Sequence, residues 1–273
     1  TGGEYLSLLE LRSTADYQVA RVCYQVPESF GEMCERLGIR LGRELNMTDD
    51  AWRFTAADQV LASEDDVRDP EIARQMLNKG YLGLHEGKTF WHYDDRWEDP
   101  PRYLVLLSNL VDKPMYSSRA RFFRFAYRTV ASSTNERTAV SCILPAGITC
   151  GHSVGIEQEA EQRRIFSAAA LEAITNSFTF DLCLRLMVGS NVTQYQLFAT
   201  PTPKCDQITR YLAHNATRLT CNHAGYATLW REQLGDTWRE ATPPFTWPVL
   251  AGDDARWAVR AAIDAVVAQA YGL

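Results

Sequence analysis

A run of aromatic residues and arginines, followed by a polar loop and an apolar run, constrains the fold of this chain more than any other stretch. It extends from Arg121 to Gly147 and reads RFFRFAYRTVASSTNERTAVSCILPAG. Aromatic and β-branched residues favour pleated structure, so residues 121–130 and 138–144 are expected to be strands. The small polar loop at residues 131–137 is expected to join them as a hairpin. Helical spacing of the arginines is the alternative for residues 121–130, and the aromatic content favours strand.

The same run is cationic within an acidic chain. Its arginines face one acidic residue, Glu136, whereas the whole chain carries a net charge of −6. A cationic, aromatic surface is typical of proteins that bind polyanions. Ion pairs with carboxylates elsewhere in the chain are the alternative. The arginines are Arg121, Arg124, Arg128 and Arg137, with Arg119 two positions before the run.

The rest of the chain mixes short β-rich segments with helical patterns. Strands are expected within residues 17–26, 39–47, 81–93 and 195–199, with a strand or apolar turn at 103–110. Helices are expected at residues 28–37, 71–78, 160–188, 206–215, 226–234 and from Asp253 or Asp254 to Tyr271. The expected fold class is α+β, with a mixed sheet containing hairpins, long packing helices and a helical C-terminal part. Residues 1–204 are expected to form the α+β region and residues 205–273 the helical region.

No pattern in the sequence predicts catalysis. The chain contains no glycine-rich phosphate loop, no G-x-S-x-G elbow and no H-E-x-x-H helix. Its seven cysteines form no C-x-x-C pair and do not combine with the five histidines at metal-ligand spacing, so no metal site is expected. Residues 99–102 and 242–245 imitate the proline motif of amino-methyltransferases but lack its full residue set, and they are interpreted as turns.

Targeting signals are absent as well. The sequence shows neither a signal peptide nor an apolar run long enough to span a membrane. We therefore expect a cytoplasmic protein without a membrane partner, in which the scattered cysteines remain reduced.

Five stretches, in order, resemble the C-terminal region of bacterial DNA adenine-N6 methyltransferases of the type IIG restriction-modification enzymes and the DISARM- and BREX-like phage-defence methylases. The first two are LHEGK at residues 84–88 with YDDRW at 93–97, and FAYR at 125–128 continuing through NERT at 135–138 to ILP at 143–145. The others are NSFTFD at residues 176–181 with Arg185, LFATPTP at 197–203, and the closing helix that ends in YGL at 271–273.

This resemblance implies a target-recognition region that binds double-stranded DNA. The methylase domain, with its S-adenosylmethionine site, is then expected upstream, so that this segment holds no cofactor and no catalytic residue. Asn176, Ser177 and Asp181 are expected to be structural, because polar groups on packed helices usually have internal partners. The candidate DNA-binding residues are Lys88, Arg96, Arg124, Arg128, Asn135, Arg137 and Thr138.

The alternative function is a protein-interaction module of a phage-defence complex that does not read bases directly. The acidic net charge favours it. In either case the expected partners include the upstream methylase domain and possible additional subunits of the defence system.

Overall fold

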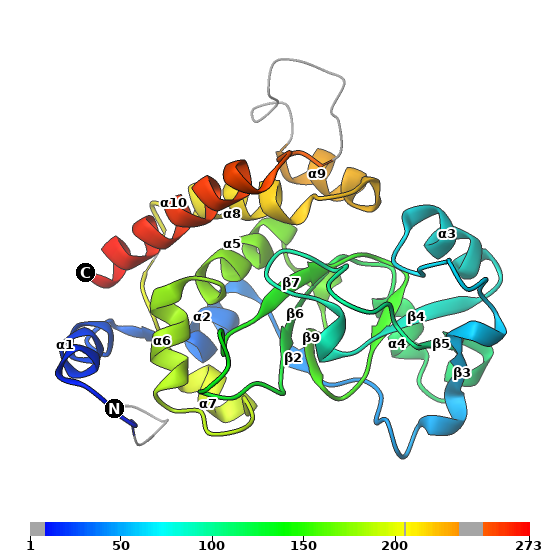
Figure 1. Cartoon of the computed structure of the whole chain (residues 1–273), viewed down its shortest axis with the longest axis horizontal. Helices are drawn as coiled ribbons and strands as arrows, with labels where there is room; N and C mark the ends of the chain where they lie inside the picture. The colour runs from blue at the N-terminus through cyan, green and yellow to red at the C-terminus, as the bar shows by residue number, and fades with distance from the viewer. Residues whose placement is uncertain (1–8, 205, 235–247) are drawn as a thin grey trace.

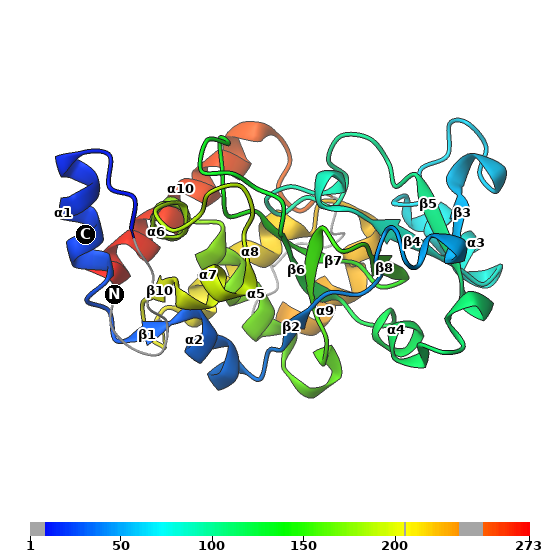
Figure 2. The ribbon, with the colours of Figure 1, turned by 90° about the horizontal axis from the view of Figure 1, so that it is seen from below.

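The computed structural model describes residues 9–204, 206–234 and 248–273 (Figure 1). Helices gather at one end of the elongated molecule, and a small sheet with two short helices forms the other end (Figures 1 and 2). A second sheet lies between them. The fold is α+β, which confirms the fold class expected from the sequence.

The central sheet has the strand order β2-β9-β6-β7, and all of its neighbouring strands are antiparallel. Phe125 on β6 lies opposite Ile143 on β7, so the expected pairing of the two runs is confirmed. However, β6 also bonds to β9, so it is an interior strand of the sheet. The strands are Leu41–Gly42 (β2), Arg124–Arg128 (β6), Ser141–Leu144 (β7) and Val154–Glu157 (β9).

Side chains of β6 alternate between two buried environments. Phe125 and Tyr127 pack in the main core against the helices. Ala126 belongs to a second core on the opposite face of the sheet, together with Phe90. Because strand side chains alternate with a period of two, Arg124 and Arg128 lie on the face of Ala126. That face is not exposed to solvent. It is covered by the small sheet at the other end of the molecule and by the turn that follows strand β4 of that sheet.

The outer sheet has the strand order β3-β5-β4-β8, in which β4 and β8 are parallel and the other pairs antiparallel. Helix α3 beside it begins with Asp69, whose side chain accepts the N–H of Glu71 at 2.9 Å, and ends before Gly80. Gly80 has a φ of +83°, which suits glycine. The elements are Phe54–Ala56 (β3), Tyr81–His85 (β4), Tyr103–Leu106 (β5), Ile148–Cys150 (β8), Pro70–Asn78 (α3) and Pro114–Arg119 (α4).

The helical end is built around α5, which packs against α8, while α10 runs alongside α8 (Figures 1 and 2). One core contains Leu171 of α5, Leu212 of α8 and Ile263 of α10. This core includes residues on both sides of position 204, and the boundary proposed there stays a prediction. The helices are Thr14–Cys23 (α1), Phe30–Leu37 (α2), Ile165–Thr175 (α5), Phe178–Arg185 (α6), Gln194–Ala199 (α7), Thr209–Thr220 (α8), Ala227–Leu234 (α9) and Asp253–Tyr271 (α10).

Short elements complete the described part. Glu28–Ser29 (β1) pairs with Pro201–Thr202 (β10). The 3₁₀ turns are Ala51–Arg53, Ala57–Gln59, Gly87–Thr89, Leu107–Leu110, Ala160–Gln162 and Ala224–Tyr226.

Two segments expected to be strands are helices. Residues 17–26 fall largely in α1, where the Ser13 hydroxyl accepts the Asp16 N–H at 3.1 Å and the Asp16 carboxylate accepts the Ser13 N–H at 3.0 Å. Residues 195–199 form most of α7, which Thr193 and Gln196 cap in the same reciprocal way. These capping boxes satisfy the free N–H groups of a first helical turn, and they outweigh the β propensity of the residues that follow.

The helix expected over residues 160–188 is broken at Asn176. The Asn176 side chain accepts the N–H of Ser141 at 2.9 Å and donates to the Ser141 carbonyl at 3.0 Å, which ties this position to β7. Ser177 then caps α6 by accepting the N–H of Phe180 at 3.3 Å. Asn176, Ser177 and Asp181 therefore have internal partners, in agreement with the structural role expected for them.

Residues 81–93 contain one strand rather than two. β4 ends at His85, and a 3₁₀ turn at Gly87–Thr89 replaces the second strand. Tyr93 beyond it has a φ of +60°, which a strand excludes. The proline segment at residues 99–101 lies in an irregular connection, as expected, whereas residues 242–245 lie outside the described residues.

Candidate functional site

Arg124 is fully buried, with 0% of its surface exposed. Its Nη1 donates to Oε1 of Glu44 at 2.6 Å, and its Nη2 donates to the carbonyl of Ile148 at 3.1 Å. Glu44 in turn accepts the N–H of Cys150 at 2.9 Å. A guanidinium enclosed in this way has no access to a phosphate. The expectation that Arg124 contacts DNA is therefore corrected, because the outer sheet covers the face of β6 on which it lies.

Thr138 is also buried, with 0% exposure. Its N–H donates to Oδ1 of Asp181 at 2.7 Å and its hydroxyl donates to the carbonyl of Ser132 at 3.0 Å. These bonds fasten the loop at residues 131–137 to helix α6. Thr138 is thus corrected from a DNA contact to a residue that positions this loop.

Arg137 is largely buried but belongs to the lining of a pocket. Its Nη2 donates to the carbonyl of Asn176 at 2.7 Å, and the group lies 4.4 Å from the ring centroid of Phe178. The nearest carboxylate is that of Asp181, at 3.5 Å. Asp181 is shared with Arg185, at 3.0 Å, so it neutralises Arg137 only in part.

Arg128 is half-buried and is held by an aromatic surface. Its guanidinium lies 4.6 Å from the ring centroid of Trp91, and its Nε donates to the carbonyl of Phe90 at 3.0 Å. Burial lowers the pKa of Arg128 to about 10. Gly87 lies in the turn beside Arg128. A Cβ at that position would be 3.7 Å from the Arg128 side chain and only 3.0 Å from the Ser153 carbonyl, so the tight packing of this turn favours glycine.

The remaining predicted residues lie at or near the surface. Lys88 and Asn135 are exposed, and each is next in sequence to a residue that packs on Arg128 or lines the pocket. Arg96 is half-buried, and its Nε donates to the carbonyl of Arg68 at 3.1 Å. DNA contact by these three residues stays a prediction.

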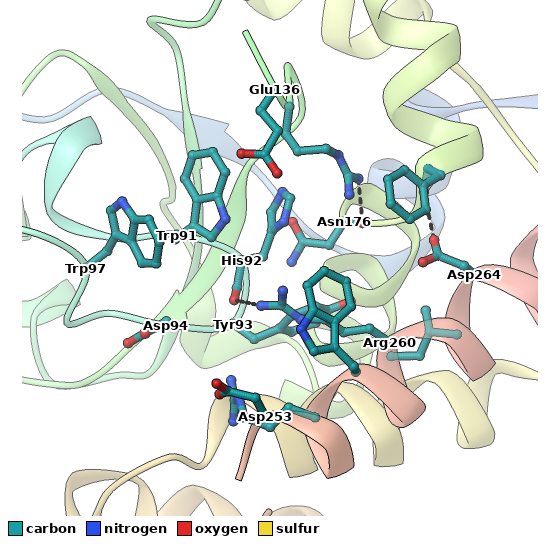
Figure 3. Close-up of a pocket in the computed structure, with 15 residues that line it drawn as sticks. Trp91, His92, Tyr93, Asp94, Trp97, Glu136, Asn176, Asp253, Arg260 and Asp264 are labelled. Carbon is teal, nitrogen blue, oxygen red and sulfur yellow. Dashed lines mark hydrogen bonds between the residues drawn. The ribbon is translucent and has the colours of Figure 1, made fainter.

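A pocket of about 420 Å³ opens between the turn at residues 91–97, the break before α6 and helix α10 (Figure 3). We call it the arginine–aromatic pocket. It is lined by Trp91, His92, Tyr93, Asp94, Trp97, Glu136, Arg137, Asn176, Phe178, Asp253, Arg256, Trp257, Arg260, Ile263 and Asp264.

Large aromatic side chains in this pocket are exposed to solvent. Trp97 is 37%, Phe178 58% and Trp257 59% exposed. The ring of Trp97 stacks on that of Trp91, with centroids 5.3 Å apart and planes at 22°. Aromatic rings that remain exposed around one concave site are typical of ligand-binding surfaces.

The arginines of the pocket are held by main-chain carbonyls and rings. Arg260 donates to the His92 carbonyl at 2.9 Å (Figure 3) and lies beside the rings of Tyr93 and Trp257. Arg256 donates to the Leu219 carbonyl at 2.9 Å. Carbonyl partners orient a guanidinium without cancelling its charge, so these groups keep their capacity to attract an anion.

The titration of the neighbouring groups reflects this positive environment. Burial, assisted by the nearby cations of Arg256 and Arg137, lowers the pKa of Arg260. Burial and the cations of Arg137, Arg260 and Arg128 lower the pKa of His92 well below its usual range. His92 is therefore neutral at physiological pH, and its Nε2 bonds to the carbonyl of Ala139 at 2.8 Å.

Carboxylates are also present in the lining. Asp264 accepts the N–H of Phe178 at 2.8 Å, and Asp94 accepts the side-chain amide of Asn222 at 3.0 Å. Glu136 and Asp253 are exposed. The pocket thus offers hydrogen-bond acceptors at its rim beside the arginine donors.

Backbone strain occurs at the same place. Tyr93 is a buried tyrosine in the left-handed region, at φ +60°, where a bulky residue is an outlier. Such strain is often concentrated at binding and catalytic sites. Here it brings the His92 carbonyl to Arg260.

Sequence reasoning missed the contribution of α10. Trp257 of this helix is exposed at the pocket. The spacing Arg256-Trp257-x-x-Arg260 places three such side chains on one side of a helix and is the local signal that could have indicated them.

Among residues 9–204, 206–234 and 248–273 no group of histidine, cysteine and acidic residues is arranged to hold a metal ion. Within the same residues, no helix is long and apolar enough to cross a membrane.

Comparisons with known proteins find distant structural likeness only. No family model and no curated protein matches the chain. Chains of solved structures do match, among them the type IIL restriction-modification enzyme MmeI in complex with DNA, with a TM-score of 0.43 and 12% sequence identity. That match covers 99% of this chain and 35% of the MmeI chain, so this chain spans about a third of the length of MmeI.

Proposed function

We propose that this chain is the target-recognition region of a DNA adenine-N6 methyltransferase from a restriction-modification or phage-defence system, and that it binds double-stranded DNA. The observation that carries the proposal is a set of arginines in and beside the pocket whose guanidinium groups are oriented by main-chain carbonyls. Arg128 and Arg260 both have this arrangement.

The electrostatics favour a polyanionic partner. An acidic protein of net charge −6 repels DNA overall, so binding requires a local positive surface. Burial lowers the pKa values of Arg128, Arg256 and Arg260, because nearby carboxylates such as Asp94 offset the desolvation of the protonated forms only in part. A phosphate would offset more of it through charge-assisted hydrogen bonds.

The exposed predicted residues extend this surface. Lys88 follows Gly87, which packs on Arg128, and Asn135 precedes Glu136 at the rim of the pocket. Arginines and Lys88 would position the DNA backbone, and Asn135 is suited to bidentate contact with adenine. Methyl transfer, together with S-adenosylmethionine binding, would belong to the upstream methylase domain.

The test is the salt dependence of duplex binding. Fluorescence anisotropy of a short labelled duplex is measured with the full-length protein carrying Arg128→Gln, between about 50 and 200 mM salt. Glutamine retains a donor for the Phe90 carbonyl while removing the charge. We expect weaker binding and a slope of log K against log salt that is smaller by about 1.

Arg74→Gln is the matched control, because Arg74 is exposed on α3 and pairs with Glu71. Arg74→Gln should leave the affinity for the duplex and the slope of log K against log salt unchanged. An Arg128→Gln variant with the slope of the wild type would overturn the role assigned to Arg128 in DNA binding. Failure of the wild-type protein to bind duplex DNA at low salt, with capture of a defence-system subunit, would instead favour the protein-interaction module.

A further inference from the structure

The arginine–aromatic pocket combines features that the backbone of a fully paired duplex does not use. Phosphate contacts need cations, but they do not need the exposed rings of Trp97, Phe178 and Trp257. Within a duplex the faces of the bases are stacked on one another and are inaccessible to such rings. The exposed rings therefore suit a ligand that has a free planar face.

The size of the pocket agrees with one small planar ligand. Its volume of about 420 Å³ lies within the usual range for small-molecule sites, roughly 300–1,000 Å³. Aromatic side chains come from two directions, the turn at residues 91–97 and helix α10 (Figure 3). The turn contributes Trp91 and Trp97 to the lining, and helix α10 contributes Trp257, so that indole rings from both elements are available to a planar ligand.

The arginines provide a place for an anionic group beside the carboxylates of the lining. Arg256 and Arg260 are oriented there by main-chain carbonyls, which leaves their guanidinium charge able to attract a phosphate. Guanidinium donors at a concave site are suited to phosphate oxygens.

We propose that the arginine–aromatic pocket binds a single unpaired nucleotide of DNA, with its base against the exposed rings and its phosphate at the arginines. This inference rests on the proposed function, because it takes duplex DNA as the source of the nucleotide. It adds a base-specific contact outside the methylase domain.

The carboxylates of the rim determine which bases fit best. Glu136 and Asp253 are exposed acceptors beside the pocket. Carboxylates accept hydrogen bonds from the exocyclic amino groups of cytosine and adenine, whereas thymine has no amino group and its one donor, N3–H, lies between two carbonyl oxygens that repel a carboxylate. The pocket therefore prefers an unpaired cytosine or adenine to an unpaired thymine.

The test compares DNA probes that differ at one nucleotide. The probes are a fully paired duplex, the same duplex with one unpaired adenine in one strand, and the same duplex with an abasic nucleotide in that place. The unpaired adenine has already lost its pairing, so the full-length protein should bind this probe about tenfold more tightly than the paired duplex. The abasic probe should lose most of this gain.

Trp257→Ala should abolish the preference for the unpaired adenine, so that the paired and unpaired probes bind with equal affinity. Trp52→Ala is the matched control, since Trp52 is another exposed tryptophan, 66% accessible, that does not line the pocket. Phe178→Ala is a second variant with the same expected result. Thermal unfolding verifies that each variant is folded. If either Trp257→Ala or Phe178→Ala is unfolded, the other of these two variants decides the test.

The outcomes separate the two proposals. Equal affinity for all three probes, with normal salt-dependent binding, would overturn this inference and leave the proposed function intact. No binding to any DNA would overturn the proposed function. Quenching of tryptophan fluorescence by deoxyadenosine monophosphate in that case, lost in Trp257→Ala, would show that the pocket takes a free nucleotide and would overturn the DNA source.

Discussion

The guanidinium of Arg124 and the carboxylate of Glu44 form a fully enclosed ion pair, with Nη1 and Oε1 2.6 Å apart. Glu44 comes from the segment after β2, and Arg124 begins β6, so the pair joins parts of the chain 80 positions apart. The Thr149 hydroxyl and the Cys150 N–H occupy the other oxygen of Glu44 at 3.0 and 2.9 Å. The pair thus links the central sheet to the outer sheet.

Removing one member of this pair should strongly destabilise the protein. Glu44→Gln leaves the buried Arg124 charge without its counter-ion, so the free energy of unfolding should fall by about 3–5 kcal/mol. Urea denaturation followed by tryptophan fluorescence measures it. Glu71→Gln, which breaks the exposed pair with Arg74, is the control and should cause no measurable change. Equal stability of Glu44→Gln and the wild type would contradict this account.

Glu172 makes the stability depend on pH. It is 0% exposed on α5, where its oxygens accept the Ile143 N–H at 3.0 Å and the Thr220 hydroxyl at 2.8 Å. Burial raises the pKa of Glu172 to about 8. Because the folded pKa lies above the unfolded value, the contribution of this group is full below the unfolded pKa and is lost as the pH rises through about 8.

In Glu172→Gln the side-chain amide supplies a hydrogen-bond acceptor and a donor at the same place, as a protonated carboxyl does, but the amide does not titrate. Between the two pKa values, the wild type should lose stability relative to this variant by up to about 1.4 kcal/mol per pH unit. Urea denaturation of both proteins at several pH values gives the difference directly, since all other titrating groups are shared. A difference that does not vary with pH would show that Glu172 is charged in the folded protein.

Lys88 provides a test of the DNA surface that leaves the core untouched. Its side chain is exposed in the turn beside Arg128, so Lys88→Ala should weaken duplex binding by about threefold and lower the salt slope by about 1, with unchanged thermal unfolding. Lys79→Ala, at the end of α3, alters another exposed lysine and should bind as the wild type does. Indistinguishable binding by both variants would remove Lys88 from the interface.

Ser177 should matter for stability through its cap. Its hydroxyl accepts the Phe180 N–H and donates to the Ile174 carbonyl at 2.7 Å, joining the end of α5 to the start of α6. Ser177→Ala should reduce the free energy of unfolding by about 1 kcal/mol. Ser177→Asp can still cap the helix, so it should lose less of the free energy of unfolding than Ser177→Ala does. The comparison is made by urea denaturation, and equal loss in both variants would argue against capping.

Local signals allowed part of the fold to be predicted. Pro70 with its acidic cap and Gly80 mark α3, and Gly272 marks the end of α10, because proline and glycine restrict or relax the backbone at single positions. The pairing of β6 with β7 followed from two apolar runs around a polar loop. The failures at α1 and α7 arose where a capping box competed with β propensity over a few residues.

The candidate site was predicted less completely. Arg128 and Arg137 were identified from their local concentration of charge and do lie at or beside the pocket. Arg256, Trp257 and Arg260 were not identified, because nothing near them in sequence indicates that α10 lies across the turn at residues 91–97.

The sequence by itself determined the α+β class, part of the helices, the pairing of β6 with β7 and a cationic aromatic run in an acidic chain. Those properties depend on backbone preferences and on side-chain alternation over a few residues. Only the tertiary structure decided that the outer sheet covers one face of β6 and encloses Arg124, whereas Arg128, four residues along on the same face, reaches the aromatic surface of Trp91. Burial depends on which distant segments pack together, and that free energy is distributed over the whole core rather than over any one segment.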